Sequence, residues 1–572
     1  MERLHRITDP FALSSYRKAL APALVSAAGL ALGDMADAVV LGQRMGATGL
    51  AAVSLALPVF MMINLIMHGF GAGGAIVFSR YLGEGKPQKA ADSFSQVFAA
   101  VVLIGAVLAL AGTLMLSPIV QLLGARPENG DLYTATRTYV QCILMGIPIF
   151  FVSYVLNYYL RNDDNQVLAS RGFTIGNLTD LGLNVLLVLV FDLGVLGAAL
   201  STVLGQCVAV IIYLPGLFRK SHALHLHPVR IRLSEVVRCF SVGLSTSVQY
   251  SYQLLFFLLA NRVLMMGFGE NGVAIFNLLQ NISYLALYLY DGAAKAAQPL
   301  VSTYAGERNR ISCRATLFLS MFTGNLLGGL VCVVLAAAAP AVCLLFGLSD
   351  AGQVAAGSEA VRIYCVSLLF AGSNTVLESY CQACGQERRA LILATLRGAV
   401  LLLPGTLVFS LLNARMFWWL FPSVEILSLA VFFAVAPLLA PVRQDGCAVF
   451  TYTIPCTSPD IGQLVPRVQQ FCSDHGATPS QEFFAGMAVE EICLAALEHL
   501  FGDRRDGIVQ VTVVASEQGV FELHIRDNGA RFDPFLTPDS DPSSMGIAVI
   551  RQKAKSFFYR HYQGFNTLTI CI

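Results

Sequence analysis

Long apolar segments recur through the first 441 residues of this chain and restrict it to the membrane-spanning class. We count twelve of them, each near or above the roughly 20 apolar residues that a helix needs to cross a bilayer core. They lie at residues 14–42, 50–80, 91–119, 132–160, 165–190, 194–217, 236–265, 272–303, 311–339, 355–382, 387–410 and 415–441. In lipid the backbone must satisfy its own hydrogen bonds, so we predict an all-α polytopic membrane protein with 12 transmembrane helices.

Basic residues concentrate in the short loops that follow the even-numbered segments. These loops hold Lys86, Lys89, Arg161, Arg171, Arg219, Lys220, Arg230, Arg232, Arg308, Arg310, Arg314, Arg388 and Arg389, whereas the opposite loops mostly hold one arginine each. Lys and Arg favour the cytoplasmic side of a membrane. We therefore expect a multi-pass protein of the cell inner (cytoplasmic) membrane with both termini in the cytoplasm. Membrane lipid is the expected surrounding, and a net charge of only +1 gives no sign of a nucleic-acid partner.

An internal repeat relates the two halves of the membrane part. Residues 49–85 match residues 272–308 at one constant offset (272 − 49 = 306 − 83 = 223). The matched pairs are Gly49 with Gly272, Gly69 with Gly292, Ser79 with Ser302, Gly83 with Gly306 and Glu84 with Glu307. An offset of six helices keeps the same topology in both halves, which predicts two lobes, at about 14–217 and 236–441, with a substrate path between them.

Carboxylates inside these apolar segments are the main functional candidates. Asp37 and Asp180 fall within the first and fifth segments, and Asn184 lies one turn after Asp180 on the same helix face. Ionisable groups in a membrane are costly and tend to be functional. Carboxylate, amide and hydroxyl oxygens can bind Na⁺, and a desolvated carboxylate alone can carry H⁺. Glu378 has no obvious partner in sequence, and we expect it in the substrate cavity, facing a cationic small molecule.

Three local patterns in residues 1–441 resemble the MATE (multidrug and toxic compound extrusion) family. They are Asp37-Ala-Val-Val-Leu-Gly42, Ser79-Arg-Tyr-Leu-Gly83-Glu-Gly85, and the run from Gly194 to Gln206 that contains Thr202. The resemblance implies a V-shaped antiporter driven by Na⁺ or H⁺, with Asp37, Asp180, Asn184 and Thr202 as the ion-coupling site. Many relatives carry Asn-x-x-x-Asp on the fifth helix, and here the order is reversed as Asp180-Leu-Gly-Leu-Asn184, which leaves the choice of ion open.

The composition changes near Pro441, and the remaining chain reads as one soluble cytoplasmic domain at residues 445–572. We predict helices at 464–475, 479–501 and 545–562, paired strands at 509–515 and 520–526, and a closing strand at 565–572. The tail resembles the GHKL nucleotide-binding fold, an α/β sandwich found in anti-sigma-factor serine kinases and histidine-kinase ATPase domains. The matching runs are Arg526-Asp-Asn-Gly-Ala-Arg-Phe-Asp-Pro534, Ala488 to His499, Ser544-Met-Gly-Ile547 and Gly564 to Ile570.

This second resemblance implies an ATP site with two gaps. It implies that Asp527 binds the adenine amino group, that Gly529 lets the purine approach, and that Gly546 and Thr569 complete the nucleotide site. Glu491 stands where the family has its general base. Ala495 replaces the Asn that holds Mg²⁺, and Ser544 replaces the first glycine of the phosphate loop. Because a bridging Mg²⁺ is central to phosphoryl transfer, we expect a nucleotide-binding regulator and not an active kinase.

Two other classes of function stay open. One is a membrane-anchored anti-sigma-type serine kinase that signals to a cytoplasmic regulatory protein, and Ala495 argues against it. The other is a flippase for a lipid intermediate, which has similar lobes. No metal site is expected in either domain.

Overall fold

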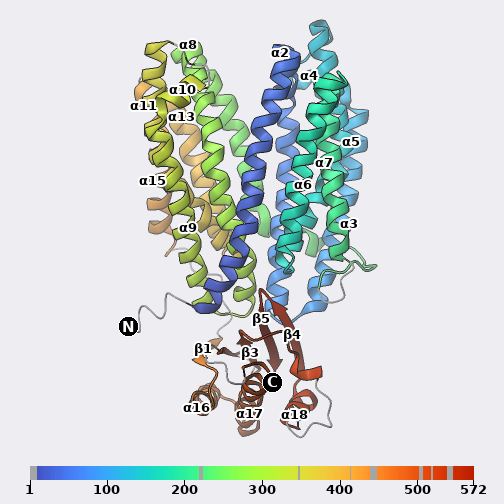
Figure 1. Cartoon of the computed structure of the whole chain (residues 1–572), viewed down its shortest axis with the longest axis vertical. Helices are drawn as coiled ribbons and strands as arrows, with labels where there is room; N and C mark the ends of the chain where they lie inside the picture. Colours follow the sequence, from blue (N-terminus) through green and yellow to red (C-terminus); the bar gives the residue numbers. More distant parts are fainter. Residues whose placement is uncertain are drawn as a thin grey trace.

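The fold comprises a bundle of long helices and, at one end of it, a small domain built on a sheet (Figure 1). This computed structural model describes residues 9–217, 223–345, 348, 350–412, 414–437, 447–501, 507–516, 519–536 and 545–572. Among the described residues, eight stretches of helix are long and apolar enough to cross a membrane, and Leu420–Val435 is a shorter apolar helix. Each of the twelve expected segments contains helix.

The first lobe is formed by the helices up to residue 217. They are α2 (Pro10–Gly83), α3 (Pro87–Leu114), the short α4 (Leu116–Leu122), α5 (Asp131–Asn162), α6 (Gln166–Asn184), which continues as a π-helix over Val185–Val190, and α7 (Gly194–Leu217). We call this the N-lobe.

The second lobe, the C-lobe, repeats the arrangement. It contains α8 (Leu233–Gly306), α9 (Arg310–Ala337), the short α10 (Ala339–Leu345), α11 (Ala351–Ala383), α12 (Glu387–Thr395), a π-helix over Leu396–Leu401, α13 (Leu402–Ser410), α14 (Ala414–Phe417) and α15 (Leu420–Val435).

The first and second expected segments form one helix, α2, and so do the seventh and eighth, in α8. A straight helix of 74 residues would be about 110 Å long. Both ends of α2 nevertheless lie at the sheet domain: the Phe11 ring centroid is 5.0 Å from that of Phe565, and Gly85 packs on Thr569. The helix therefore doubles back, as Figure 1 shows. No proline interrupts residues 43–49 or 266–271, so these connections stay helical where we expected loops.

The two lobes touch through glycines at the end of the bundle that faces the sheet domain. A Cβ added at Gly83 would come within 2.2 Å of the Thr303 carbonyl oxygen, and one at Gly306 within 2.4 Å of the Arg80 carbonyl oxygen. These contacts are reciprocal, because the repeat relates both pairs of positions (303 − 80 = 306 − 83 = 223). The predicted repeat is thus a structural pseudo-two-fold relation between the lobes.

In its described residues, the sheet domain has five antiparallel strands in the order β1-β2-β3-β5-β4. Its elements are β1 (Ala448–Pro455), α16 (Ser458–Asp474), α17 (Pro479–Ala496) with a π-helical end over Leu497–Phe501, β2 (Ile508–Ala515), β3 (Phe521–Asp527), α18 (Met545–Lys553), β4 (Ser556–Tyr562) and β5 (Phe565–Cys571). Strands β2 and β3 confirm the predicted paired strands at 509–515 and 520–526, and β5 confirms the predicted closing strand at 565–572. We call this domain the tail.

One predicted helix of the tail, at 545–562, is wrong in its second half. The helix ends at Lys553, and residues 556–562 form strand β4 instead. Gln563 and Gly564 both have positive φ, of 56° and 81°, which is the backbone of a two-residue hairpin turn between β4 and β5. The aromatic residues Phe557 and Phe558 favour the strand once β5 is there to pair with.

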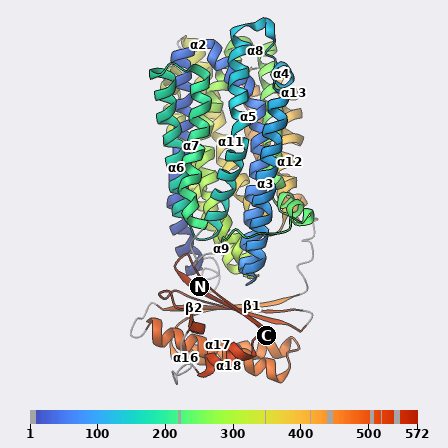
Figure 2. The same cartoon turned by 90° about the vertical axis from the view of Figure 1, so that its right-hand side faces the viewer.

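The sheet separates two different environments. Helices α16, α17 and α18 cover its far face, and the membrane part lies against its near face (Figure 2). Side chains alternate along each strand. Val511, Leu523, Ile525 and Leu568 therefore point into the core shared with α16 and α17, while the alternate residues point toward the membrane part.

Candidate functional site

Three of the four predicted ion-coupling residues lie in the N-lobe on α6 and α7. Asn184 is 1% exposed and is the last residue before the π-helix, a local distortion that is frequent at functional sites. Asp180 is half-buried one turn earlier and packs on α7: a Cβ added at Gly205 would come within 2.9 Å of Asp180 Cβ. Thr202 lies one turn before Gly205, and its hydroxyl donates to the Ala198 carbonyl oxygen at 3.1 Å. Three of the four residues are thus close in the fold.

The fourth predicted residue, Asp37, lies in helix α2, and its side chain is outside the described residues. Two further polar residues of α6, Thr174 and Asn177, extend the polar face toward the start of the helix. Thr174 Oγ1 and Asn177 Nδ2 are buried and have no hydrogen-bond partner among the described residues. Thr174, Asn177 and Asp180 follow one another at intervals of three residues, which was a signal that sequence reasoning could have used.

Glu378 on α11 lies in the C-lobe and is 4% exposed. Gln249 Nε2, from α8, donates to Glu378 Oε1 at 2.5 Å. A separate pair lies nearby in the same lobe: Arg397 Nη2 is 2.7 Å from Glu425 Oε1, and Asn374 donates to Glu425 Oε2 at 2.6 Å. Sequence reasoning missed this pair because its members come from different helices, and no spacing along the chain connects them.

A buried histidine lies between the lobes. His68 of α2 is hydrogen-bonded through Nδ1 to the Tyr158 hydroxyl at 2.8 Å, and its ring is stacked at 4.9 Å on Tyr250 of the other lobe. Lys295 Nζ, also from the other lobe, lies 5.9 Å from the Tyr158 ring centroid. Lys295 Nζ is paired with Asp291 Oδ2, one turn earlier on the same helix, at 2.5 Å. No pattern of neighbouring residues singles out His68.

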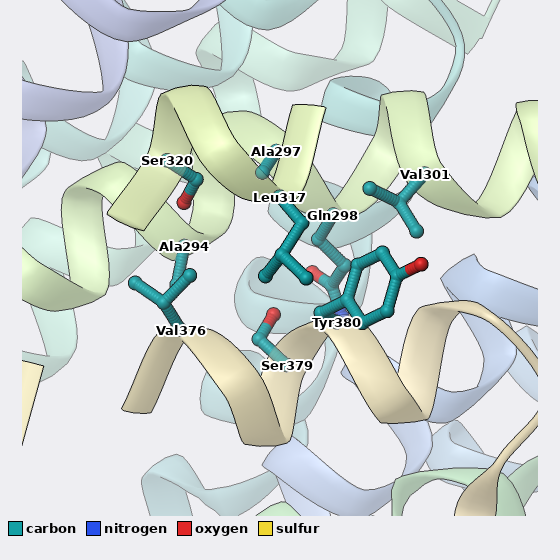
Figure 3. A pocket seen from close by; sticks show the side chains of 9 residues that line it. All are labelled: Ala294, Ala297, Gln298, Val301, Leu317, Ser320, Val376, Ser379 and Tyr380. Atoms are coloured by element: carbon teal, nitrogen blue, oxygen red, sulfur yellow. The ribbon is translucent and has the colours of Figure 1, made fainter. Parts of the chain in front are cut away.

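A small space inside the C-lobe is too narrow for a substrate. It has a volume of about 10 Å³, enough for about one water molecule. Figure 3 shows its lining, which comes from α8, α9 and α11: Ala294, Ala297, Gln298, Val301, Leu317, Ser320, Val376, Ser379 and Tyr380. Glu378 does not line this space.

In the tail, Asp527 and Gly529 form the end of a candidate adenine pocket. Asp527 Oδ1 accepts hydrogen bonds from the Gly529 N–H and from Asn566 Nδ2, both at 2.8 Å. Burial raises the pKa of Asp527 to about 6. A Cβ added at Gly529 would come within 2.7 Å of Leu500, so the backbone here can be approached closely only because the residue is glycine. Sequence reasoning did not assign Asn566 to this site.

The phosphate end of the pocket fits the nucleotide less well. Glu491 lies against Gly546: a Cβ added there would come within 2.1 Å of the Glu491 carboxyl carbon. Burial raises the pKa of Glu491, and Glu490 adds to the effect. Ala495 is buried and offers no ligand for Mg²⁺. Among the described residues, no three His, Cys, Asp or Glu side chains gather as a metal site. Within the described part of this site, the donor set fits an adenine base but supplies no ligand for a magnesium–phosphate group.

Thr569 lies apart from this pocket, on the opposite face of the sheet. Its hydroxyl is 3.1 Å from His524 Nδ1, and its methyl group lies against Gly85 of the membrane part. Residues 566, 568 and 570 of β5 face the pocket and the core, so the alternation of the strand directs 569 the other way. The structure therefore does not bring Thr569 together with Asp527.

Comparisons with known sequences agree with this two-part architecture. Residues 22–186 and 242–408 each match the MatE family, and residues 457–572 match the histidine kinase-like ATPase domain. The multidrug export protein MepA of Staphylococcus saprophyticus is 25% identical over 362 residues, which cover 62% of this chain and 77% of that protein. MepA of Staphylococcus aureus is 24% identical over 366 residues, with the same two coverages.

Solved structures share the fold of the membrane part. An outward-facing multidrug resistance MATE family transporter of the MOP superfamily superposes with a TM-score of 0.70 at 21% identity, covering 74% of this chain and 95% of that one. A MATE protein in complex with MaL6 gives a TM-score of 0.69 at 22% identity, with the same coverage.

Proposed function

Because this chain belongs to the MatE family, we propose that it is a secondary antiporter that exports small organic, cationic compounds in exchange for Na⁺ or H⁺. The observation that carries the proposal is the polar face of α6, where Asp180 and Asn184 lie inside an apolar lobe against α7. A carboxylate placed in lipid is costly unless it is used. The Staphylococcus relatives are multidrug export proteins by name, which supports small organic compounds as the cargo.

The coupling ion would be held by Asp180, Asn184, Thr202 and Asp37. Carboxylate, amide and hydroxyl oxygens are hard ligands of the kind that alkali and alkaline-earth cations prefer. Asp180 alone would be sufficient for H⁺, since a desolvated carboxylate takes up a proton more readily. In either case the ion neutralises the N-lobe carboxylate, and its release restores the charge.

The cationic cargo would be attracted by Glu378. This carboxylate is buried in the C-lobe, where the neutral amide of Gln249 donates a hydrogen bond to it. A buried negative charge held by a neutral donor is stabilised further by a cation. Asp291, in contrast, already has Lys295 as its partner, which makes it a weaker candidate for cargo binding.

We place the protein in the cytoplasmic membrane with the tail in the cytoplasm. Support comes from basic residues at the helix ends beside the tail: Lys86 and Arg308 follow α2 and α8, Arg161 is in the last turn of α5, and Arg389 is in the first turn of α12. Basic loops of this length favour the cytoplasmic side. The tail would then be exposed to cytoplasmic nucleotides and to any cytoplasmic regulatory protein.

The tail would bind the adenine end of ATP or ADP and regulate transport without transferring phosphate. Asp527 would accept the adenine amino group, Gly529 would allow the base to approach, and Gly546 lies where a helix N-terminus favours an anion. With Ala495 in place of the Mg²⁺ ligand, we expect no phosphoryl transfer. Ala495 in place of the Mg²⁺ ligand also counts against the alternative function of a membrane-anchored serine kinase.

Transport into proteoliposomes tests the antiport. The full chain should move a fluorescent organic cation when a Na⁺ or a pH gradient is imposed, and the gradient that works identifies the ion. Asp180→Asn should reduce gradient-driven transport to background. Asp350→Asn is the matched control, because Asp350 is the exposed N-cap of α11 and Asn caps a helix equally well. Full transport by Asp180→Asn would exclude this coupling site.

A further inference from the structure

The near face of the tail sheet is a buried polar surface. It carries the side chains that alternate away from the tail core, and we call it the docking face. Its buried members are Gln510, Thr512, His524, Arg526, Thr567 and Thr569. Polar side chains of an isolated domain lie in solvent. Here they are covered by the ends of the membrane helices, so the face is built to bind that surface.

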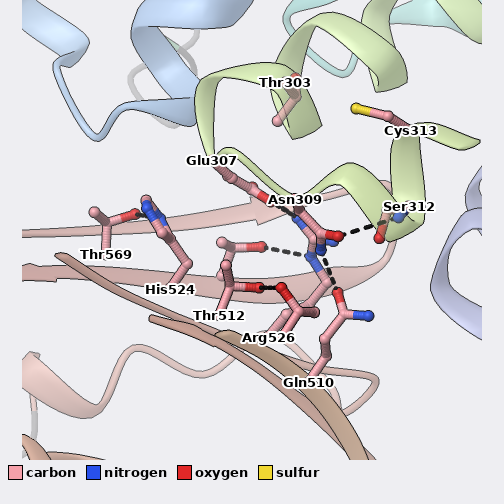
Figure 4. Close-up of polar contacts among 12 residues, drawn as sticks. Thr303, Glu307, Asn309, Ser312, Cys313, Gln510, Thr512, His524, Arg526 and Thr569 are labelled. Atoms are coloured by element: carbon pink, nitrogen blue, oxygen red, sulfur yellow. Dashed lines mark hydrogen bonds and ion pairs between the residues drawn. The ribbon is translucent and has the colours of Figure 1, made fainter. Parts of the chain in front are cut away.

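An ion pair anchors the docking face to the C-lobe. Arg526 Nη2 lies 2.6 Å and 2.5 Å from the two carboxylate oxygens of Glu307, directly after the end of α8. The side chains are 6% and 4% exposed. Asn309 Nδ2 donates to Gln510 Oε1 at 2.8 Å beside this pair. Figure 4 shows Glu307 and Asn309 reaching down to Arg526 and Gln510 on the sheet.

The same sheet also holds the N-lobe, through the β4–β5 hairpin. The Gln563 N–H donates to Asp164 Oδ1 at 3.1 Å, and Lys18 Nζ donates to the Gln563 carbonyl oxygen at 3.0 Å. Arg560 Nη2 donates to the Asn162 carbonyl oxygen at 3.2 Å. Strands β3, β5 and β4 are joined by continuous ladders. One rigid element therefore contacts both lobes.

The pseudo-symmetry of the lobes shows that the ion pair is specific to one of them. Glu84 and Glu307 are equivalent positions of the repeat (307 − 84 = 223). Glu307 is buried against Arg526, whereas Glu84 Oε2 pairs with the exposed Lys86 at 2.7 Å. The chain thus has an internal control for the tail contact.

The lobes are closed where the tail holds them. Besides the glycine contact, Arg80 of the N-lobe donates to the carbonyl oxygens of Gln382 and Ala383, at 2.5 Å and 3.2 Å, and pairs with Glu387 of the C-lobe at 2.7 Å. An antiporter that alternates by rocking its lobes must separate these ends in one half of its cycle. Such a separation would pull Asn162 and Glu307 apart beneath one sheet.

We propose that the tail is a clamp that binds the tail-proximal ends of both lobes and keeps that side of the transporter closed. The clamp rests on the proposed antiport, since it acts on the same rocking motion. Release of Arg526 from Glu307 is the step that lets this side open. The buried charges allow little partial release, because either one left behind without its partner is strongly unfavourable. Asp527, the next residue of β3, faces the nucleotide pocket, so a nucleotide would bind on the back of the strand that carries Arg526.

Hydrogen exchange of the full chain in nanodiscs tests the clamp, with transport measured on the same preparation. Glu307→Gln should increase exchange on the order of 100-fold in the hairpin at 556–566 and also in the lobe ends at 80–86 and 303–309, since breaking a buried pair from one side is strongly destabilising. The initial transport rate should rise with it. Glu84→Gln, its pseudo-symmetric control, should change neither.

Three results would distinguish the alternatives. Faster exchange in the hairpin alone, with unchanged lobe ends, would overturn the clamp, and so would equal effects of Glu307→Gln and Glu84→Gln. Restored protection in the charge-swapped Glu307→Arg/Arg526→Glu double variant would support the specific pair, because it would trace the loss in Glu307→Gln to the missing partner charge. An absence of transport in every protein, with the exchange changes intact, would refute the proposed export and leave the clamp supported.

Discussion

Acid should loosen the contact between the tail and the membrane part because of His524. Its Nδ1 is hydrogen-bonded to Thr569, and burial, with Arg526 and Arg308 nearby, lowers its pKa to about 3 from 6.5. The Glu522 carboxylate is 3.9 Å from Nε2, too far to offset these effects. The pKa of His524 is lower in the docked tail than in solvent, so docking is undiminished above pH 6.5, where the histidine is neutral in both states. As the pH falls from 6.5 toward 3, the undocked histidine takes up a proton and docking becomes weaker.

The size of the effect follows from these two values. Between pH 7.5 and pH 5.5 the undocked histidine takes up a proton that the docked one does not, which weakens docking by about 1.4 kcal/mol, or about tenfold in the docking equilibrium. Glu307 acts in the opposite direction, because burial raises its pKa and favours its protonated form in the docked state. The contribution of His524 is therefore measured as the difference in pH dependence between the wild-type protein and a variant with no titrating side chain at position 524.

Hydrogen exchange of residues 556–566 at the two pH values provides the measurement. After correction for the intrinsic pH dependence of exchange, the wild-type hairpin should lose about tenfold more protection at pH 5.5 than the His524→Gln variant, in which the amide keeps a hydrogen bond to Thr569 without titrating. Parallel losses in the two proteins would refute the role of His524.

Three more outcomes follow from the geometry. Nucleotide affinity of the full chain, measured by calorimetry, should fall as the pH drops below about 6, because protonated Asp527 can no longer accept a hydrogen bond from the adenine amino group. The Asp527→Asn variant should lose both the binding and its pH dependence. Ala495→Asn should add Mg²⁺-dependent nucleotide binding; no response to Mg²⁺ would mean that more than this ligand is missing. Gly83→Ala should separate the lobes and lower the melting temperature, because its Cβ would lie 2.2 Å from the Thr303 carbonyl oxygen. Gly182→Ala, whose Cβ would have no atom within 4 Å, should leave the melting temperature unchanged.

Much of the architecture follows from local sequence signals. The apolar segments located the membrane helices, and the constant offset of 223 related Gly83 to Gly306 before their contact was visible. The resemblance to the GHKL fold assigned Asp527 and Gly529 to one nucleotide site, and in the fold the Gly529 N–H donates to Asp527 Oδ1. The strand at 556–562 was missed because its pairing with β5, and not its own pattern, decides its conformation. A two-residue turn at Gln563 and Gly564 joins the two strands.

Hydropathy, repetition and short motifs were enough to predict two matched lobes, an appended α/β domain and the pair Asp180 and Asn184, because these signals are properties of neighbouring residues. The three-dimensional fold alone shows that Arg397 pairs with Glu425, that His68 stacks on Tyr250, and that Thr569 faces the membrane part. It alone joined Arg526 to Glu307, 219 residues earlier in the chain. Such pairs arise when separately folded surfaces come together, and no local pattern encodes which two surfaces will meet.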